Sequence, residues 1–252
     1  MVNFDQAYSE YYNLLYCDKD YQSETEYVDK LIKCRGKADS RKVLDIGCGT
    51  GRHAKALAAK NYFVYGIDRS KEMISQAEKT VEDGENLSFK VASAEDFSFD
   101  FKFDAVVSLF HVMSYLTDNS TLFQCFNNVY DALDNGGVFI FDFWYGPAVY
   151  AQKCTNRIKT LENDNFRILR FAEPVEDTQC NKVTVKYNMV CLDKRNNSAL
   201  NFQEEHPMRY FFLPELQFML EKSGFRDIHF EEFLSGNAPS VNTWGVCCTV
   251  RK

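Results

Sequence analysis

A glycine-rich run directly after a short apolar segment constrains the fold of this chain more than any other feature. Residues 43–46 read Val-Leu-Asp-Ile and predict a buried strand, and residues 47–51 read Gly-Cys-Gly-Thr-Gly. Residues 52–60 have a helical pattern, so the order strand, tight turn, helix is expected. Glycines let the backbone approach a ligand closely, because they have no Cβ. The run therefore predicts a ligand site at the carboxyl edge of a parallel sheet.

Strand and helix patterns alternate on both sides of this run. Helical spacing predicts helices over residues 4–16, 22–34, 70–77 and 122–133, and Ser70 is a suitable N-cap. Strands are expected at residues 63–67, 87–91, 103–109 and 138–143, with a turn at 135–137. After Pro214 a helix is expected to run to residues 223–224, followed by strands at 228–234 and 243–250. The alternation predicts a doubly wound, parallel α/β sheet.

The pattern changes between residues 155 and 211, where strands follow one another without helices. Residues 183–191 alternate in polarity with a period of two, and turn signals lie at 162–165 and 195–198. We expect an antiparallel β-sheet inserted into the α/β fold. The predicted division is an N-terminal helical cap (1–36), an α/β domain (37–150 and 212–252) and the inserted β subdomain (151–211).

Charge and composition exclude several classes of function. The chain has 29 Lys and Arg against 36 Asp and Glu, a net charge of −7, which argues against nucleic-acid binding. No apolar run is long enough to span a membrane, and the first residues lack signal-peptide features, so a cytoplasmic protein is expected. The nine cysteines are odd in number and contain no C-x-x-C pair, so no metal site is expected.

Acidic residues end three successive predicted strands. Asp45 precedes the first glycine, Asp68 ends the next strand, and residues 94–96 (Ala-Glu-Asp) follow the third. A carboxylate at Asp45 would repel a pyrophosphate, and the spacing G-x-G-x-G differs from the dinucleotide pattern. S-adenosylmethionine carries a sulfonium and an ammonium but no phosphate. Asp68 can accept both ribose hydroxyls and the third acid can accept the adenine amino group, so this cofactor is predicted.

At these residues the chain resembles the class I S-adenosylmethionine-dependent methyltransferases, over residues 40–143 and 213–251. The resemblance implies a Rossmann-like, seven-stranded sheet whose last strand is antiparallel. It also implies roles in cofactor binding for the methionine-side residues Gly47 and Gly49, the ribose ligand Asp68, the adenine-side residues Arg69, Met73, Ala94, Glu95 and Asp96, and the methyl-side residues Leu109 and Phe110.

A closer resemblance is to the N-methyltransferases of nucleotide-linked amino sugars of the desosamine and mycaminose type. It is carried by residues 12–16 with 19–21, 103–110 with 115–116, 142–147, and the inserted sheet leading to 209–211. Ser114, Phe143 and residues 235–240 depart from the family pattern around the acceptor. The resemblance implies cofactor contacts for Tyr12 and Tyr21, and substrate contacts for Tyr16, Trp144, Tyr145 and Arg209.

Methyl transfer from a sulfonium requires mainly that the acceptor is positioned in line, in a pocket that excludes water. A base helps an amine to attack, and the candidates are His111, Tyr115 and Tyr21, although water can also serve. The alternative for His111 is a partly buried structural histidine that bonds to the backbone. The other histidines, His53, His206 and His229, are interpreted as solvated or structural.

The alternative to an amine acceptor is O- or C-methylation of another small metabolite. A third hypothesis is a module that binds the cofactor without catalysis, or a methyltransferase that acts on protein or RNA. The net negative charge of the chain argues against an RNA substrate. The inserted sheet is expected to shape the acceptor pocket or to form a homodimer.

Overall fold

The computed structural model describes residues 19–37, 39–82 and 86–252, which fall into two compact units. The α/β unit comprises residues 20–152 and 210–252, and the second unit includes residues 153–209. The helix expected over residues 4–16 lies outside the described residues. The division into a cap, an α/β domain and a β subdomain remains a prediction.

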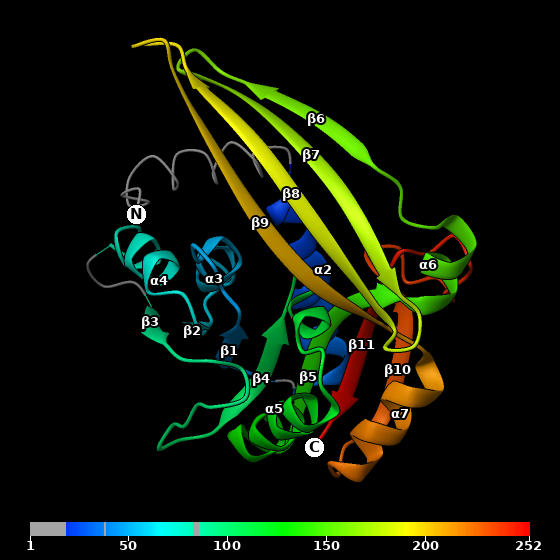
Figure 1. Cartoon of the computed structure of the whole chain (residues 1–252). Helices are drawn as coiled ribbons and strands as arrows, with labels where there is room; N and C mark the ends of the chain where they lie inside the picture. The colour runs from blue at the N-terminus through cyan, green and yellow to red at the C-terminus, as the bar shows by residue number, and fades with distance from the viewer. Residues whose placement is uncertain (1–18, 38, 83–85) are drawn as a thin grey trace. The chain divides into compact units, whose positions relative to one another are not determined.

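A twisted, mostly parallel sheet forms the centre of the α/β unit, in the order β3-β2-β1-β4-β5-β11-β10 (Figure 1). Strands β1 to β5 pair in parallel, and β11 pairs antiparallel with both β5 and β10. The predicted doubly wound α/β fold with an antiparallel last strand is confirmed. The strands are β1 (Lys42–Ile46), β2 (Phe63–Asp68), β3 (Leu87–Val91), β4 (Phe103–Ser108), β5 (Leu133–Tyr145), β10 (Arg226–Glu232) and β11 (Gly245–Arg251).

Successive residues of each strand project apolar side chains to opposite faces of the sheet. Both faces are therefore apolar, and helices cover them. On one face α2 (Tyr21–Arg35) and α3 (Arg52–Ala58) pack on residues such as Val43, Ile140 and Cys247. On the other face α5 (Asn119–Ala132) and α7 (Leu213–Lys222) pack on residues such as Phe139 and Phe141. The remaining helices are α4 (Lys71–Glu78), the 3-10 helix η1 (Val112–Tyr115) and α6 (Gly146–Gln152).

The second unit contains four long antiparallel strands, as the period-two pattern predicts. β6 (Arg157–Glu162), β7 (Phe166–Asp177), β8 (Lys182–Asp193) and β9 (Ser198–Phe211) pair in sequence order. Leu161, Phe166 and Cys191 belong to their common buried cluster. β9 ends in the α/β unit, where Tyr210 and Phe211 pair in parallel with Trp144 and Tyr145 of β5.

Two local predictions were wrong. β5 starts at Leu133 rather than at residue 138, because the buried Leu133 already pairs with Phe103 and a register shift absorbs the turn residues that follow. Helix α6 was not predicted. Its seven residues give too short a periodic pattern to recognise.

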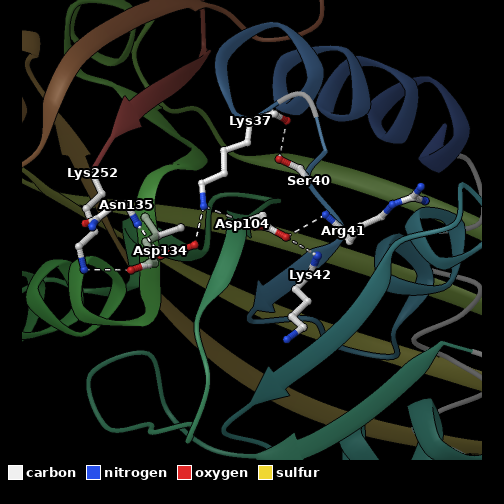
Figure 2. Close-up of polar contacts among 9 residues, drawn as sticks. Lys37, Ser40, Arg41, Lys42, Asp104, Asp134, Asn135 and Lys252 are labelled. Carbon is white, nitrogen blue, oxygen red and sulfur yellow. Dashed lines mark hydrogen bonds and ion pairs between the residues drawn. The ribbon is translucent and has the colours of Figure 1, made fainter.

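A cluster of ion pairs and backbone contacts fixes the start of β1 against β4 (Figure 2). Asp104 Oδ2 accepts hydrogen bonds from the backbone N–H groups of Arg41 and Lys42, both at 2.9 Å. Lys37 Nζ lies 3.8 Å from Asp104 Oδ1 and also pairs with Asp134. One carboxylate therefore satisfies two donors at the beginning of β1.

Replacing Asp104 by alanine is expected to lower the free energy of unfolding by about 1–3 kcal/mol, because two backbone donors lose a charged acceptor. Urea denaturation of Asp104→Ala and wild type measures this change. The matched control is Asp100→Ala, which removes an exposed aspartate from the preceding loop. Equal destabilisation by both variants would contradict the assignment.

Candidate functional site

The glycine loop follows β1 in a conformation that requires glycine. Gly47, Gly49 and Gly51 have φ values of +73°, +55° and +79°, in the left-handed region. A Cβ on Gly47 would lie 2.6 Å from both Cγ atoms of Val112. The backbone N–H groups of Gly47 and Cys48 donate to the Ile67 carbonyl oxygen, at 2.8 and 3.0 Å. The loop is thus held against β2, and Val112 fills the space that a side chain at residue 47 would need.

Two of the predicted acids lie at this loop. Asp45 is 2% exposed, and Asp68 ends β2 beside it in the sheet order. Asp68 Oδ2 accepts from Gly49 N and Oδ1 from Ser70 N, both at 2.9 Å. Burial raises the pKa of the Cys48 thiol, and the charges of Asp45 and Asp68 raise it further. The negative charges of both carboxylates are therefore close to Cys48 in the loop.

The third acidic segment begins next to Asp68. The backbone N–H of Ala92 donates to the Asp68 carbonyl oxygen at 3.0 Å, and Asn128 Nδ2 of α5 donates to the Glu95 carbonyl oxygen at 2.7 Å. The predicted N-cap Ser70 is confirmed, since its Oγ accepts from Met73 N at 3.2 Å. The structure thus gathers the predicted nucleoside-binding residues at adjacent strand ends: Asp68, Arg69, Met73, Ala94, Glu95 and Asp96.

After β4 a strained turn presents His111 to Asp142. Phe110 and His111 have φ values of +68° and +61°, which two successive non-glycine residues adopt only when their surroundings enforce it. Asp142 Oδ1 accepts from His111 N at 3.0 Å, and its Oδ2 lies 2.7 Å from His111 Nδ1. The Asp142 side chain is 2% exposed and that of His111 is 24% exposed. Asp142 therefore anchors the His111 backbone by a hydrogen bond and lies beside Nδ1 without aligned hydrogen-bond geometry, and the ring is reachable from solvent.

Aromatic side chains surround this histidine. The Trp144 ring lies edge-on to it with a centroid distance of 6.4 Å, and Phe110 stacks on it at 6.2 Å. Trp244 contacts Trp144 at 5.5 Å, and a Cβ on Gly245 would lie 3.3 Å from His111 Cε1. The wall around His111 is thus apolar and closely fitted.

Other predicted residues of this region lie at different depths. Leu109 is 3% exposed and belongs to the core under α2 and α3, whereas Phe110 is exposed. Tyr115, at the end of η1, and Tyr145, at the end of β5, are half-buried. Ser114 is buried, and its hydroxyl accepts from Trp144 N at 3.1 Å.

Tyr21 lies over the helix that follows the glycine loop. Its ring is 4.8 Å from that of His53 and has the Arg52 guanidinium 5.1 Å from its centroid. His53 Nε2 lies 2.7 Å from Glu24 Oε2, and His53 is 7% exposed. His53 was expected to be a solvated helix residue. This expectation is wrong, because α2 covers the side chain and buries it. Burial raises the pKa of Tyr21, while Arg52 opposes that rise.

Three predicted residues are not placed in this site. Tyr12 and Tyr16 lie outside the described residues. Arg209 is 7% exposed and lies opposite Lys182 in the second unit. Their roles remain predictions.

Sequence reasoning missed Asp142 and Arg52 as functional candidates. Asp142 was noted only as part of a family segment, although it follows a run of apolar residues in β5 as Asp45 and Asp68 do in theirs. An acid after an apolar run in the fifth strand is the sequence signal that identifies Asp142. Arg52 directly follows the last loop glycine, and nothing in the sequence pairs it with Tyr21.

The donor set fits S-adenosylmethionine. It offers the carboxylates of Asp45 and Asp68 for a cationic, hydroxyl-bearing ligand, beside a glycine loop at the carboxyl end of β1. Among the described residues no group of three or more His, Cys, Asp or Glu is arranged to hold a metal ion. In those same ranges no helix has the length and apolarity needed to cross a bilayer.

Comparison with known proteins agrees with this chemistry. Residues 43–137 match the methyltransferase domain family. The chain is 23% identical over 235 residues to dTDP-3-amino-3,4,6-trideoxy-alpha-D-glucopyranose N,N-dimethyltransferase of Streptomyces venezuelae, covering 92% of this chain and 96% of that one.

Solved structures share the fold. An S-adenosylmethionine-dependent methyltransferase from Clostridium acetobutylicum superposes with a TM-score of 0.79 at 22% identity, over 98% of both chains. The sugar N-methyltransferase KedS8 from Streptoalloteichus gives 0.81 at 20% identity, over 97% of this chain and 93% of that one. Residues 43–137 therefore form a methyltransferase domain, the protein is an S-adenosylmethionine-dependent enzyme, and the chain as a whole is similar to the amino-sugar N-methyltransferases.

Proposed function

We propose that this enzyme transfers a methyl group from S-adenosylmethionine to the amine of a nucleotide-linked amino sugar. The observation that carries the proposal is the His111–Asp142 pair, set in an aromatic wall at the carboxyl edge of the sheet. The relative from Streptomyces venezuelae, which spans nearly the whole chain, is an amino-sugar dimethyltransferase by name and supports the acceptor class.

The residues of the glycine loop and the strand ends hold the cofactor in this proposal. Gly47 and Gly49 receive its methionine part, with Asp45 opposite the positive charge and Tyr21 beside the loop. Asp68 accepts the ribose hydroxyls, and the segment of Glu95 and Asp96 reads the adenine amino group. When bound, the cofactor supplies a methyl group that its sulfonium already activates.

His111 receives the proton that the amine loses. Asp142 engages Nδ1, so it stabilises the tautomer with hydrogen on Nδ1 and leaves Nε2 as an acceptor. Trp144, Tyr145 and Phe110 exclude water from the amine, which strengthens its nucleophilicity. Tyr115 keeps its predicted role as a candidate base and Tyr12 its predicted contact with the cofactor. Tyr16 and Arg209 keep their predicted contacts with the substrate. The cytoplasmic location and the homodimer also remain proposals.

Methylation of a hydroxyl is the second candidate, and the same pair favours it. A hydroxyl is far less acidic than an ammonium group, so its methylation needs a positioned base. Replacing both His111 and Tyr115 should abolish turnover if the acceptor is a hydroxyl.

Transfer of radiolabelled methyl to purified nucleotide sugars tests the acceptor. The panel pairs each dTDP- or UDP-amino sugar with the sugar that carries a hydroxyl at the same carbon. Label is expected in the amino sugar of at least one pair and not in its hydroxyl partner. Labelling of hydroxyl partners alone, or of no sugar amine, would overturn the proposal.

A further inference from the structure

The two tryptophans of the chain lie against each other near His111 and form what we call the tryptophan corner. Trp144 is near the end of β5, and Trp244 directly precedes β11, where its neighbour Gly245 pairs with Trp144. The indole centroids are 5.5 Å apart and the ring planes are inclined at 66°. Both tryptophans are half-buried, whereas the adjacent Phe143 is fully buried. The corner therefore stands at the edge of the core rather than inside it.

The loop between β10 and β11 fixes Trp244 in the tryptophan corner. Glu232, the last residue of β10, accepts hydrogen bonds from the hydroxyl groups of Ser235 and Thr243, at 2.5 and 3.1 Å. Thr243 is 2% exposed, so the residue before Trp244 is buried. The Trp244 carbonyl oxygen accepts from the backbone N–H of Tyr145 at 3.0 Å. Trp244 is thus held through its own backbone and through its neighbour in the chain.

The tryptophan corner lies at the imidazole that receives the proton in the proposed function. The ring of His111 is 6.4 Å from that of Trp144, with the planes inclined at 73°. A Cβ on Gly245 would lie 3.3 Å from His111 Cε1, so the chain next to Trp244 passes close to the imidazole. An acceptor nitrogen that reaches His111 therefore has aromatic rings around it.

Aromatic rings at this place favour a positively charged acceptor. A sugar amine carries an extra proton in neutral solution and is an ammonium group, whereas a hydroxyl is neutral. The face of an indole attracts a cation that lies within about 6 Å of the ring centroid, more strongly than the other aromatic side chains do. Because the two indole centroids are 5.5 Å apart, one nitrogen can lie within that distance of both. A hydroxyl gains none of this attraction.

We propose that Trp244, together with Trp144, binds the acceptor as an ammonium group and so selects an amine over a hydroxyl. The inference rests on the proposed function for the nature of the acceptor and adds a residue that determines specificity. The proton of the bound ammonium passes to His111, as in that function. A cation is expected to bind about two- to thirtyfold more tightly than a neutral group of the same size.

Fluorescence titration of the enzyme loaded with S-adenosylhomocysteine tests this inference, because both tryptophans of the chain belong to the corner. The probes are tetramethylammonium chloride and tert-butanol, a neutral molecule of similar size, at constant ionic strength. Wild type is expected to prefer the cation by about two- to thirtyfold. In Trp244→Leu this preference should fall by at least half, with Trp144 as the remaining fluorophore. Trp244→Phe keeps an aromatic face and should restore part of the preference.

Phe218→Leu is the matched control, since it removes an exposed aromatic ring from α7 and should leave both affinities unchanged. Equal weakening of both probes in Trp244→Leu would show that Trp244 only maintains the loop, and this result would overturn the inference. The absence of a cation preference in wild type would overturn it as well.

The titration needs no turnover, so it separates this inference from the proposed function. A cation preference that depends on Trp244, in an enzyme that methylates no sugar amine, would support the tryptophan corner and reject the nucleotide-linked acceptor. Methylation of a sugar amine without any cation preference would reject the role of Trp244 and leave the proposed function standing.

Discussion

An Asp68→Ala enzyme is expected to bind S-adenosylmethionine at least tenfold more weakly than wild type. The carboxylate is expected to accept the ribose hydroxyls, and the same two oxygens hold the backbone N–H groups of Gly49 and Ser70. Its removal therefore takes away contacts to the ligand and the link between the glycine loop and β2. Each hydrogen bond to a charged group contributes about 1.5–3 kcal/mol, so a loss of ten- to several-hundredfold follows. Isothermal calorimetry measures the affinity.

Two further variants separate the contributions at this position. Asp68→Asn keeps one carbonyl oxygen and should fall between alanine and wild type. Glu78→Ala removes an exposed acid from the end of α4 and should bind the cofactor normally. A folded Asp68→Ala protein with wild-type affinity would show that the cofactor does not bind at the end of β2.

Asp142→Asn is expected to reduce kcat/KM about a hundredfold below neutral pH and much less at alkaline pH. The asparagine amide no longer offers a negatively charged acceptor to Nδ1, so the tautomer with an acceptor at Nε2 loses its support. General-base catalysis contributes about 10²–10⁴ in rate. At high pH the amine is already neutral in solution, so the base matters less. Initial rates across the pH range measure the effect.

His111→Ala should show the same pH-dependent loss, because both variants remove one proton acceptor. Asp118→Asn, at the exposed start of α5, is the charge-matched control and should follow wild type. A loss in Asp142→Asn that is equal at all pH values would indicate that the carboxylate only maintains the turn at Phe110 and His111. The two variants thus distinguish base catalysis from backbone support.

The cofactor side of the site was predictable from local sequence. The strand, the three glycines and Asp68 lie within one segment, and each is determined by conformations and pairings of near neighbours. Left-handed φ values at Gly47, Gly49 and Gly51 show why these three positions are glycine. The capping role of Ser70 is likewise encoded within three residues.

The His111–Asp142 pair was only half predictable, because it depends on contacts between distant segments. His111 and Asp142 are 31 residues apart in sequence, and their approach requires the parallel pairing of β4 with β5. Nothing local marks the positive φ at Phe110 and His111, since neither residue favours it. The burial of His53 also depends on α2, whose position over α3 is a tertiary property.

The way in which Asp68 is held has an evolutionary consequence. Its two donors are peptide N–H groups of Gly49 and Ser70, which every residue except proline supplies. A change of the side chain at residue 70 therefore leaves its N–H donor in place, whereas residue 49 must remain glycine because of its left-handed φ of +55°. Relatives of this sequence can therefore vary at residue 70 and still keep the Asp68 carboxylate in the same direction.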